Sequence, residues 1–293
     1  MNHAQSMSVT DDRVSDYFLL LKPKVMSLVV FTGFAGMWVA PGIENLHRFL
    51  AFIAMLCLAV GAGAAGAINM WFDRDIDAVM NRTKDRPLPM GRVRAEEALS
   101  YGIILSIASV VTMGLALNWL AAALLAAANL FYVFIYTIWL KRLTPQNIVI
   151  GGAAGAFPPL IGWAAVTGDI ALYPVILFLI IFFWTPPHFW ALSLFANEDY
   201  KRANIPMMTV VAGERHTKIQ MLVYTLILLP LTLSPYFLGL ADFGYLVAAA
   251  TLSGFFVFTA LRVLASDNLK NAKLMFGYSV FYLFALFLAV MVL

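Results

Sequence analysis

The sequence predicts an all-α membrane protein, in which about nine transmembrane helices form a bundle around a central cavity and two pseudo-repeated halves face each other. Composition is the first observation behind this prediction. Of the 293 residues, 62% are hydrophobic and 12% are charged, whereas about a quarter of the residues of a soluble domain are charged. The second observation is that the apolar residues form continuous blocks of about 20, the length of a membrane-spanning helix.

The apolar blocks follow one another from residue 25 to the last residue. They cover residues 25–42, 49–71, 97–116, 119–139, 147–166, 172–195, 219–238, 243–264 and 274–293. Because the blocks are continuously apolar and do not alternate with polar residues, helices are the expected spanning form. We expect residues 1–24 to be a polar cytoplasmic segment without a cleaved signal peptide, and residues 1–293 to form a single polytopic domain.

Basic residues indicate the orientation in the membrane, because Lys and Arg gather on the cytoplasmic side. With a cytoplasmic N-terminus, all but one of the 19 Lys and Arg residues fall on that side, and Arg48 is the exception. Arg92 and Arg94 are expected to be solvated markers of this topology. The net charge of +3 therefore reflects topology and predicts no nucleic-acid binding. The single cysteine, Cys57, excludes a disulfide within the chain.

An acidic cluster ends the second apolar block, with the pattern Asn69-x-x-x-Asp73-x-x-x-Asp77. Spacing of four residues places these side chains on one face of a helix. Carboxylates at a membrane-embedded helix end are costly unless they are paired, and the helix dipole disfavours them at a C-terminus. We therefore expect Asn69, Asp73 and Asp77 to bind Mg²⁺, and the alternative is that they cap the helix and pair with arginine. Asp75 points off this face and is expected to pair with Arg74 or a loop cation.

Basic residues follow the acidic cluster directly, at Arg82, Lys84 and Arg86. Their position after a predicted magnesium site suggests that they contact a diphosphate, because arginine and lysine both bind phosphate oxygens. Lys141 and Arg142, at the end of the fourth apolar block, form a second candidate clamp. The alternative for all five is that they only mark the cytoplasmic side.

A second acidic cluster, Asn197-Glu198-Asp199, follows the sixth apolar block and precedes Lys201 and Arg202. The order of apolar helix, acidic residues and basic loop matches the first cluster, at an offset of about four spans. We interpret this match as two related halves that face a shared cavity, and the alternative is coincidence.

The sixth block contains Trp184-Thr-Pro-Pro-His188-Phe-Trp190. Adjacent prolines remove two backbone donors, so we expect a broken helix that lines the cavity. His188 is then a ligand of haem iron or a polar group near the reacting centre, and the alternative is a hydrogen-bonded core histidine. Aromatic rings at Tyr132, Tyr136, Trp184 and Trp190 are candidates for binding the acceptor, and some of them, Tyr132 and Tyr136 above all, for shielding a carbocation. The alternative is that they serve packing, as most such rings do.

Magnesium, a basic clamp and an apolar cavity together indicate an isoprenyl diphosphate as substrate. Loss of diphosphate leaves an allylic cation, and positive groups stabilise the negative charge of the leaving group. The cavity must exclude water, because water would quench the cation.

At this point the sequence resembles the UbiA-type intramembrane prenyltransferases, both in the Asn69/Asp73/Asp77 motif and in the pattern of spans. The stretches 73–89, 136–147, 184–190 and 198–200 more specifically resemble those members that farnesylate protohaem IX. The resemblance implies farnesyl diphosphate and haem B as substrates, haem O as product after water addition, and Mg²⁺ held by Asn69, Asp73, Asp77 and Asp199. It also implies a bacterial inner-membrane location and suggests contact with haem A synthase or a terminal oxidase assembly.

Two other functions, prenylation of a different aromatic ring and ion-coupled transport, fit the sequence less well. Quinone-type relatives place an aspartate near the position of His188, so the histidine favours a porphyrin acceptor over a quinone precursor or another aromatic ring. An ion-coupled transporter is disfavoured, because its charges should lie near mid-membrane and not at helix ends.

Overall fold

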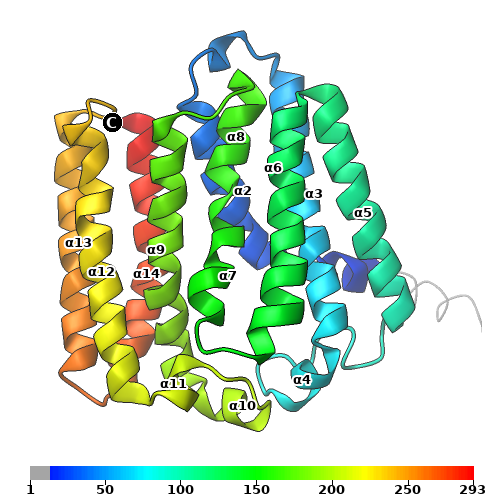
Figure 1. The fold of residues 1–293 in the computed structure, drawn as a ribbon, viewed down its shortest axis with the longest axis vertical. Coiled ribbons are helices and arrows are strands. Elements are labelled where there is room, and N and C mark those ends of the chain that lie inside the picture. The colour runs from blue at the N-terminus through cyan, green and yellow to red at the C-terminus, as the bar shows by residue number, and fades with distance from the viewer. Residues whose placement is uncertain (1–13) are drawn as a thin grey trace, which may run out of the picture.

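The computed structural model describes residues 14–293, and all regular elements within this range are helices (Figure 1). Eight helical segments are long and apolar enough to cross a membrane. A ninth span is the bent pair of Val14–Leu20 and α2 (Pro23–Trp38), whose axes meet at 52°. The predicted nine-span pattern is thus confirmed. Residues 1–13 of the predicted N-terminal segment lie outside the described residues.

The other spans keep the boundaries that the apolar blocks predict to within a few residues. They are α3 (Arg48–Phe72), α5 (Ala95–Ala116), α6 (Trp119–Leu130) continued by η2 (Phe131–Trp139) and η3 (Leu140–Arg142), α7 (Asn147–Ala156) with α8 (Pro158–Thr167), α9 (Leu172–Phe195), α12 (Glu214–Phe237), α13 (Phe243–Leu264) and α14 (Leu269–Val292). Short elements connect them: η1 (Ile43–Asn45), α4 (Arg74–Val79), α10 (Asn197–Arg202) and α11 (Met208–Val211).

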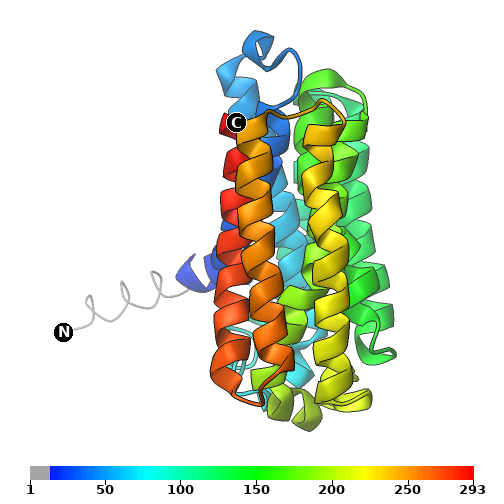
Figure 2. The same cartoon turned by 90° about the vertical axis from the view of Figure 1, so that its left-hand side faces the viewer.

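The long helices run side by side between two ends of an elongated bundle (Figures 1 and 2). The short helices α4, α10 and α11 lie together at one end, called the α4/α10 end below, and η1 lies at the other. Both acidic clusters therefore lie at the same end of the molecule, one at α4 and one at α10. In the chain they are about 120 residues apart.

Two apolar cores hold the helices together. One is formed mainly by α9, α12, α13 and α14, with Ile180, Phe256 and Tyr282 among its fully enclosed side chains. The other joins α2, α3, α5, α6 and α8, through residues such as Leu58 and Leu125. Many large apolar side chains point outward instead, as expected for a bundle whose surface meets lipid.

The two proline pairs have different effects on their helices. Pro158 and Pro159 start α8 after a break at Phe157, as a proline pair in the first turn of a helix allows. In contrast, α9 continues through Pro186 and Pro187. The predicted break of that helix is therefore wrong.

The helices α2 and α8 cross in close contact. A Cβ atom at Gly162 would overlap the carbonyl oxygen of Gly33, and one at Gly36 would overlap the backbone of Pro159. Small residues permit such close approach of membrane helices. This crossing fixes α2, and with it the residue at its start, Lys22, relative to the rest of the bundle.

We predict that Gly162→Ala lowers the free energy of unfolding by about 1–3 kcal/mol, the usual cost of overpacking. Gly155→Ala is the matched control, because nothing lies within 4 Å of a Cβ at that exposed position. Thermal unfolding of the two purified variants in detergent measures the difference. Equal midpoints for both variants would contradict the tight crossing.

Candidate functional site

Asp73 occupies the junction between two helices. The long helix α3 ends at Phe72, α4 begins at Arg74, and Asp73 belongs to neither. The backbone nevertheless keeps a helical hydrogen-bond pattern, because Asp73 N–H donates to the Asn69 carbonyl at 2.9 Å and Asp77 N–H to the Asp73 carbonyl at 2.8 Å. The spacing of four therefore still brings the three side chains to one side.

The Asp73 carboxylate is fully buried, at 0% exposure. Its Oδ2 atom accepts hydrogen bonds from the Asn69 amide at 2.7 Å and from the Lys141 ammonium group. Its Oδ1 atom has no hydrogen-bond partner, and the Arg142 guanidinium lies 3.7 Å away. A buried carboxylate is stable only when cations and donors compensate its desolvation, so Lys141 is essential to this arrangement.

Asn69 connects three segments of the chain. Its amide nitrogen also donates to Thr137 Oγ1 at 3.1 Å, and its Oδ1 atom accepts a hydrogen bond from Lys22 Nζ at 2.7 Å. Thr137 in turn donates to the Tyr132 carbonyl at 2.8 Å. Neither Lys22 nor Thr137 is among the site residues that the sequence analysis predicts.

Lys22 has a left-handed backbone conformation, with φ 54° and ψ 55°. Such a conformation is strained for a residue with a side chain and often occurs at functional sites. It forms the bend before α2, where Pro23 begins the helix. The bend turns the ammonium group toward Asn69.

Asp77 is paired with the loop that follows α4. Arg86 Nη1 donates to Asp77 Oδ2 at 2.6 Å, and the carboxylate is 3% exposed. Thr83 Oγ1 donates to the Asp77 carbonyl at 3.0 Å. The loop of residues 80–94 therefore folds back onto the acidic cluster, as the position of its cations in the sequence suggested.

The other predicted clamp residues are placed differently. Arg142 makes a two-point contact with Asp75, at 2.8 and 2.7 Å, and lowers the pKa of that carboxyl. It also donates to the Phe72 carbonyl at 3.1 Å. Asp75 thus pairs with a loop cation, as expected. Lys84 is exposed and forms no ion pair within residues 14–293.

The second acidic cluster meets the first through the same loop. The backbone N–H of Arg82 donates to Asp199 Oδ2 at 3.3 Å, and Arg202 pairs with the other carboxylate oxygen. Tyr200 packs with Ile76 of α4, and burial raises the pKa of its phenol. The structure therefore brings Asp199 to the edge of the site that contains Asp77.

A further buried oxygen lies in the second cluster. Asn197 Oδ1 is enclosed and has no hydrogen-bond partner. Glu198, its neighbour in the chain, is exposed and pairs with Lys201. Of the three polar residues that open α10, Asn197 and Asp199 thus point inward and Glu198 points outward.

A π-helical segment, Phe131–Trp139, lies between Asn69 and Lys141 in the site. It carries Tyr132 and Tyr136, whose rings lie 5.3 Å apart at 30°. Gly151 of α7 leaves room for Tyr136, because a Cβ atom there would overlap the tyrosine ring. Wide helical turns of this kind occur often at functional sites, and the regular apolar sequence did not predict one.

His188 lies in a layer of aromatic rings. It stacks on Trp184 at 4.4 Å and on Phe276 at 4.7 Å, and its Nδ1 atom contacts Ser279 Oγ at 2.6 Å. Its Nε2 atom has no hydrogen-bond partner in the described part of the chain, yet it is not completely enclosed. Trp190 is 1% exposed and packs edge-on against Tyr224 of α12. The Trp190 ring is therefore enclosed between α9 and α12.

The donors around Asp73 fit a hard divalent cation. Mg²⁺ binds oxygen ligands and usually takes few of them from protein, and the unpartnered Oδ1 atom of Asp73 offers one in a buried position. Asn69 and Asp77 supply further oxygens on the same side. Within residues 14–293, no three carboxylate, histidine or cysteine side chains form a ready-made metal cluster.

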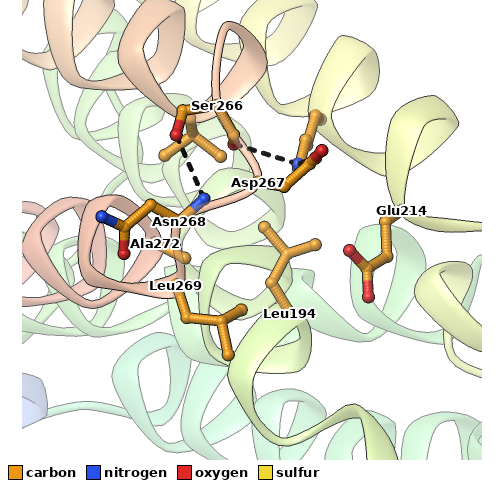
Figure 3. A pocket seen from close by; sticks show the side chains of 9 residues that line it. Leu194, Glu214, Ser266, Asp267, Asn268, Leu269 and Ala272 are labelled. Atoms are coloured by element: carbon orange, nitrogen blue, oxygen red, sulfur yellow. Dashed lines mark hydrogen bonds and ion pairs between the residues drawn. The ribbon is translucent and has the colours of Figure 1, made fainter.

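Two surface pockets lie away from these residues. The first pocket lies beside Leu194, Glu214 and the 266–269 turn (Figure 3). Its volume is about 10 Å³, which is room for about one water molecule. The second, of about 240 Å³, is lined by Tyr173, residues 239–242, Val290 and Leu293, at the end opposite α4 and α10. Neither contains a residue of the acidic clusters.

Comparison with known proteins agrees with this geometry. Residues 29–289 match the model of the UbiA prenyltransferase family. The chain is 56% identical to a protoheme IX farnesyltransferase of Agrobacterium fabrum, covering 98% of this chain and 91% of that protein. It is also 56% identical to a protein of the same name from Rhodopseudomonas palustris, with 95% and 90% covered.

Solved structures share the fold. A structure from work on digeranylgeranylglyceryl phosphate synthase superposes with a TM-score of 0.78 at 20% identity, covering 96% of this chain and 100% of that one. A UbiA homolog from Archaeoglobus fulgidus, bound to GPP and Mg²⁺, gives 0.64 at 18% identity, with 95% and 100% covered. The extent of the family match, and the identity to relatives over nearly their whole length, establish that this chain belongs to the UbiA prenyltransferase family.

Proposed function

We propose that this protein transfers the farnesyl group of farnesyl diphosphate to the vinyl group of protohaem IX, with addition of water, giving haem O and diphosphate. The observation that carries the chemistry is the buried Asp73 carboxylate, which accepts hydrogen bonds from Asn69 and Lys141 and has the Arg142 guanidinium beside it. The farnesyl donor and the haem acceptor follow from the relatives, which are 53–56% identical and are named protoheme IX farnesyltransferases.

The donor half of the site is assigned to the α4/α10 end. Asn69, Asp73 and Asp77 would hold Mg²⁺ with the diphosphate, and Asp199 would add an oxygen from the second cluster. Bound there, Mg²⁺ would neutralise charge that develops on the leaving diphosphate. The A. fulgidus relative bound to GPP and Mg²⁺ supports this assignment.

Cations of the chain would bind the diphosphate directly. Arg86 and Lys141 now contact Asp77 and Asp73, and Lys22 joins them through Asn69. Arg82 and Lys84 lie on the same loop, where their exposed side chains can reach a phosphate. Arg142 has a weaker basis for such a role, because Asp75 and the Phe72 carbonyl already occupy its donors.

The reaction breaks the C–O bond between farnesyl and diphosphate and forms a C–C bond to the vinyl group. The resulting cation takes up the oxygen of water and releases a proton. Tyr132 and Tyr136 would shield the allylic cation with their ring faces, while His188 and Trp184 would contact the porphyrin. Trp190 was proposed for the same role, but its burial against Tyr224 favours a packing role.

The finer cellular assignments are also proposals. The family and the nine spans make this a multi-pass membrane protein. The basic residues favour an orientation with the α4/α10 end in the cytoplasm, and the bacterial relatives favour an inner-membrane location. Transfer of product to haem A synthase or a terminal oxidase assembly remains a hypothesis, supported only by the chemistry of the product.

Mass spectrometry of haems tests the acceptor. Cells that lack endogenous haem O are transformed with the gene, and their haems are extracted. We expect the farnesyl hydroxyethyl adduct of protohaem IX to accumulate. A prenylated quinone precursor with unmodified haem would contradict the assignment and favour the quinone-type alternative.

Substitution tests the donor half. We predict that Asp73→Asn and Asp77→Asn each lower kcat by at least about 100-fold, because removal of groups that stabilise the leaving charge has effects of this size. Glu198→Gln, which changes an exposed carboxylate beside the second cluster, serves as control. Turnover by purified protein in detergent is the measurement, and near-normal turnover of Asp73→Asn would refute the metal assignment.

Substitution of His188 tests the acceptor half. We predict that His188→Phe keeps the stacking with Trp184 and Phe276 but raises KM for haem B more than KM for farnesyl diphosphate. His216→Ala, at an exposed position on α12, should change neither. An equal increase in both KM values for His188→Phe would indicate a structural role only.

A further inference from the structure

An ion pair joins the N-terminal helix to the loop beside the acidic cluster. Asp16, in the helix Val14–Leu20, is 6% exposed, and its two carboxylate oxygens accept hydrogen bonds from Arg92 Nε at 2.9 and 3.0 Å. Arg92 is exposed, at 39%, as expected of a topology marker, but its pairing with a buried carboxylate was not predicted. Arg94 does fit that expectation, because its side chain is 77% exposed and pairs with Glu97 within the same helical turn.

Arg92 also organises its own loop. Its Nη2 atom donates to the Asp85 carbonyl at 3.2 Å, and its backbone N–H donates to the Pro87 carbonyl at 2.9 Å. Asp85 directly precedes Arg86, the residue that holds Asp77. The guanidinium of Arg92 thus connects the carboxylate of Asp16 to the turn that presents Arg86.

The N-terminal helix carries a second cation of the site at its end. Six residues after Asp16, Lys22 donates to Asn69. Tyr17 of the same helix donates to Glu97 of α5 at 3.0 Å. The helix is therefore attached to α5 and to the loop, and its last turn leads into the bend at Lys22.

An apolar cluster lies beneath these polar contacts. It combines side chains from the N-terminal helix, α3, the 80–94 loop and α5: Leu20, Ala67, Met70, Leu88, Val93 and Ala98. The cluster lets the loop pack on the helix, but apolar contacts have no preferred direction. The two hydrogen bonds of the ion pair fix the orientation of the loop.

We propose that Asp16 and Arg92 form a positioning pair, which holds the 80–94 loop against the N-terminal helix and so presents Arg86 and Lys22 to the diphosphate. This inference rests on the proposed diphosphate site. Neither residue touches the substrate. Loss of the pair lets the loop leave the acidic cluster for part of the time. The apparent affinity for farnesyl diphosphate then falls in proportion to the fraction of time for which the loop is still in place.

The test is a double-mutant cycle with Asp16→Asn, Arg92→Gln and the variant that combines both. Each protein is purified in detergent, and tryptic cleavage after the exposed Lys84 is timed without substrates. We expect faster cleavage in all three variants and a KM for farnesyl diphosphate raised by about fivefold or more, with KM for haem B unchanged. The combined variant should resemble the single ones, because the pair acts as a unit.

Arg94→Gln is the matched control, since it removes an exposed arginine of the same segment and should leave both readouts unchanged. Wild-type cleavage rates in the three variants would overturn the proposal. Additive effects in the combined variant, or equal increases of KM for both substrates, would do the same. Failure of the proposed diphosphate site would show separately, as normal turnover in Asp73→Asn, which leaves the Asp16–Arg92 pair intact.

Discussion

The structure depends on the compensation of one buried negative charge, the carboxylate of Asp73. This carboxylate lies at 0% exposure at a helix junction, where water does not reach it and where it makes no capping hydrogen bond to α4, so other groups must compensate its desolvation. The chain compensates it from a distant segment, through Lys141 after the π-helical turn, and through Asn69 one turn earlier. Lys141 thereby joins the span that ends in η3 to α3 at the α4/α10 end, and Lys22 joins the start of α2 to the same place through Asn69.

The same pairs explain how the site could accept a charged substrate. Arg86 and Lys141 currently contact carboxylates. A diphosphate offers these cations new oxygens, and a divalent metal would then balance the carboxylates that they leave. Exchange of partners of this kind avoids any state with an uncompensated buried charge. Two of the buried oxygens that lack a hydrogen-bond partner among residues 14–293, Asp73 Oδ1 and Asn197 Oδ1, lie in the two acidic clusters that the substrate would join.

The sequence predicted the features that depend on local patterns. Continuous apolar blocks predicted nine spans, and a spacing of four predicted the face shared by Asn69, Asp73 and Asp77, because both patterns follow from helix geometry alone. Contacts between distant segments leave no such pattern in the sequence. Lys22 contacts Asn69, 47 residues away, and Arg92 contacts Asp16, 76 residues away. In the sequence, Lys22 and Arg92 are therefore indistinguishable from ordinary loop cations. The break predicted at the prolines of α9 was wrong, because α9 packs in the core with α12, α13 and α14, and packing against neighbouring helices lets a membrane helix continue where local rules predict a break.

The central claim is that oxygens of the first acidic cluster bind a divalent cation together with a prenyl diphosphate. The most direct measurement is calorimetric titration of the purified protein with farnesyl thiodiphosphate, an unreactive analogue, in the presence of Mg²⁺ and again in EDTA. The account predicts that EDTA weakens binding by more than about tenfold in the wild-type protein, and that Asp73→Asn removes this dependence on Mg²⁺. Equal affinity with and without the metal in the wild-type protein would contradict it.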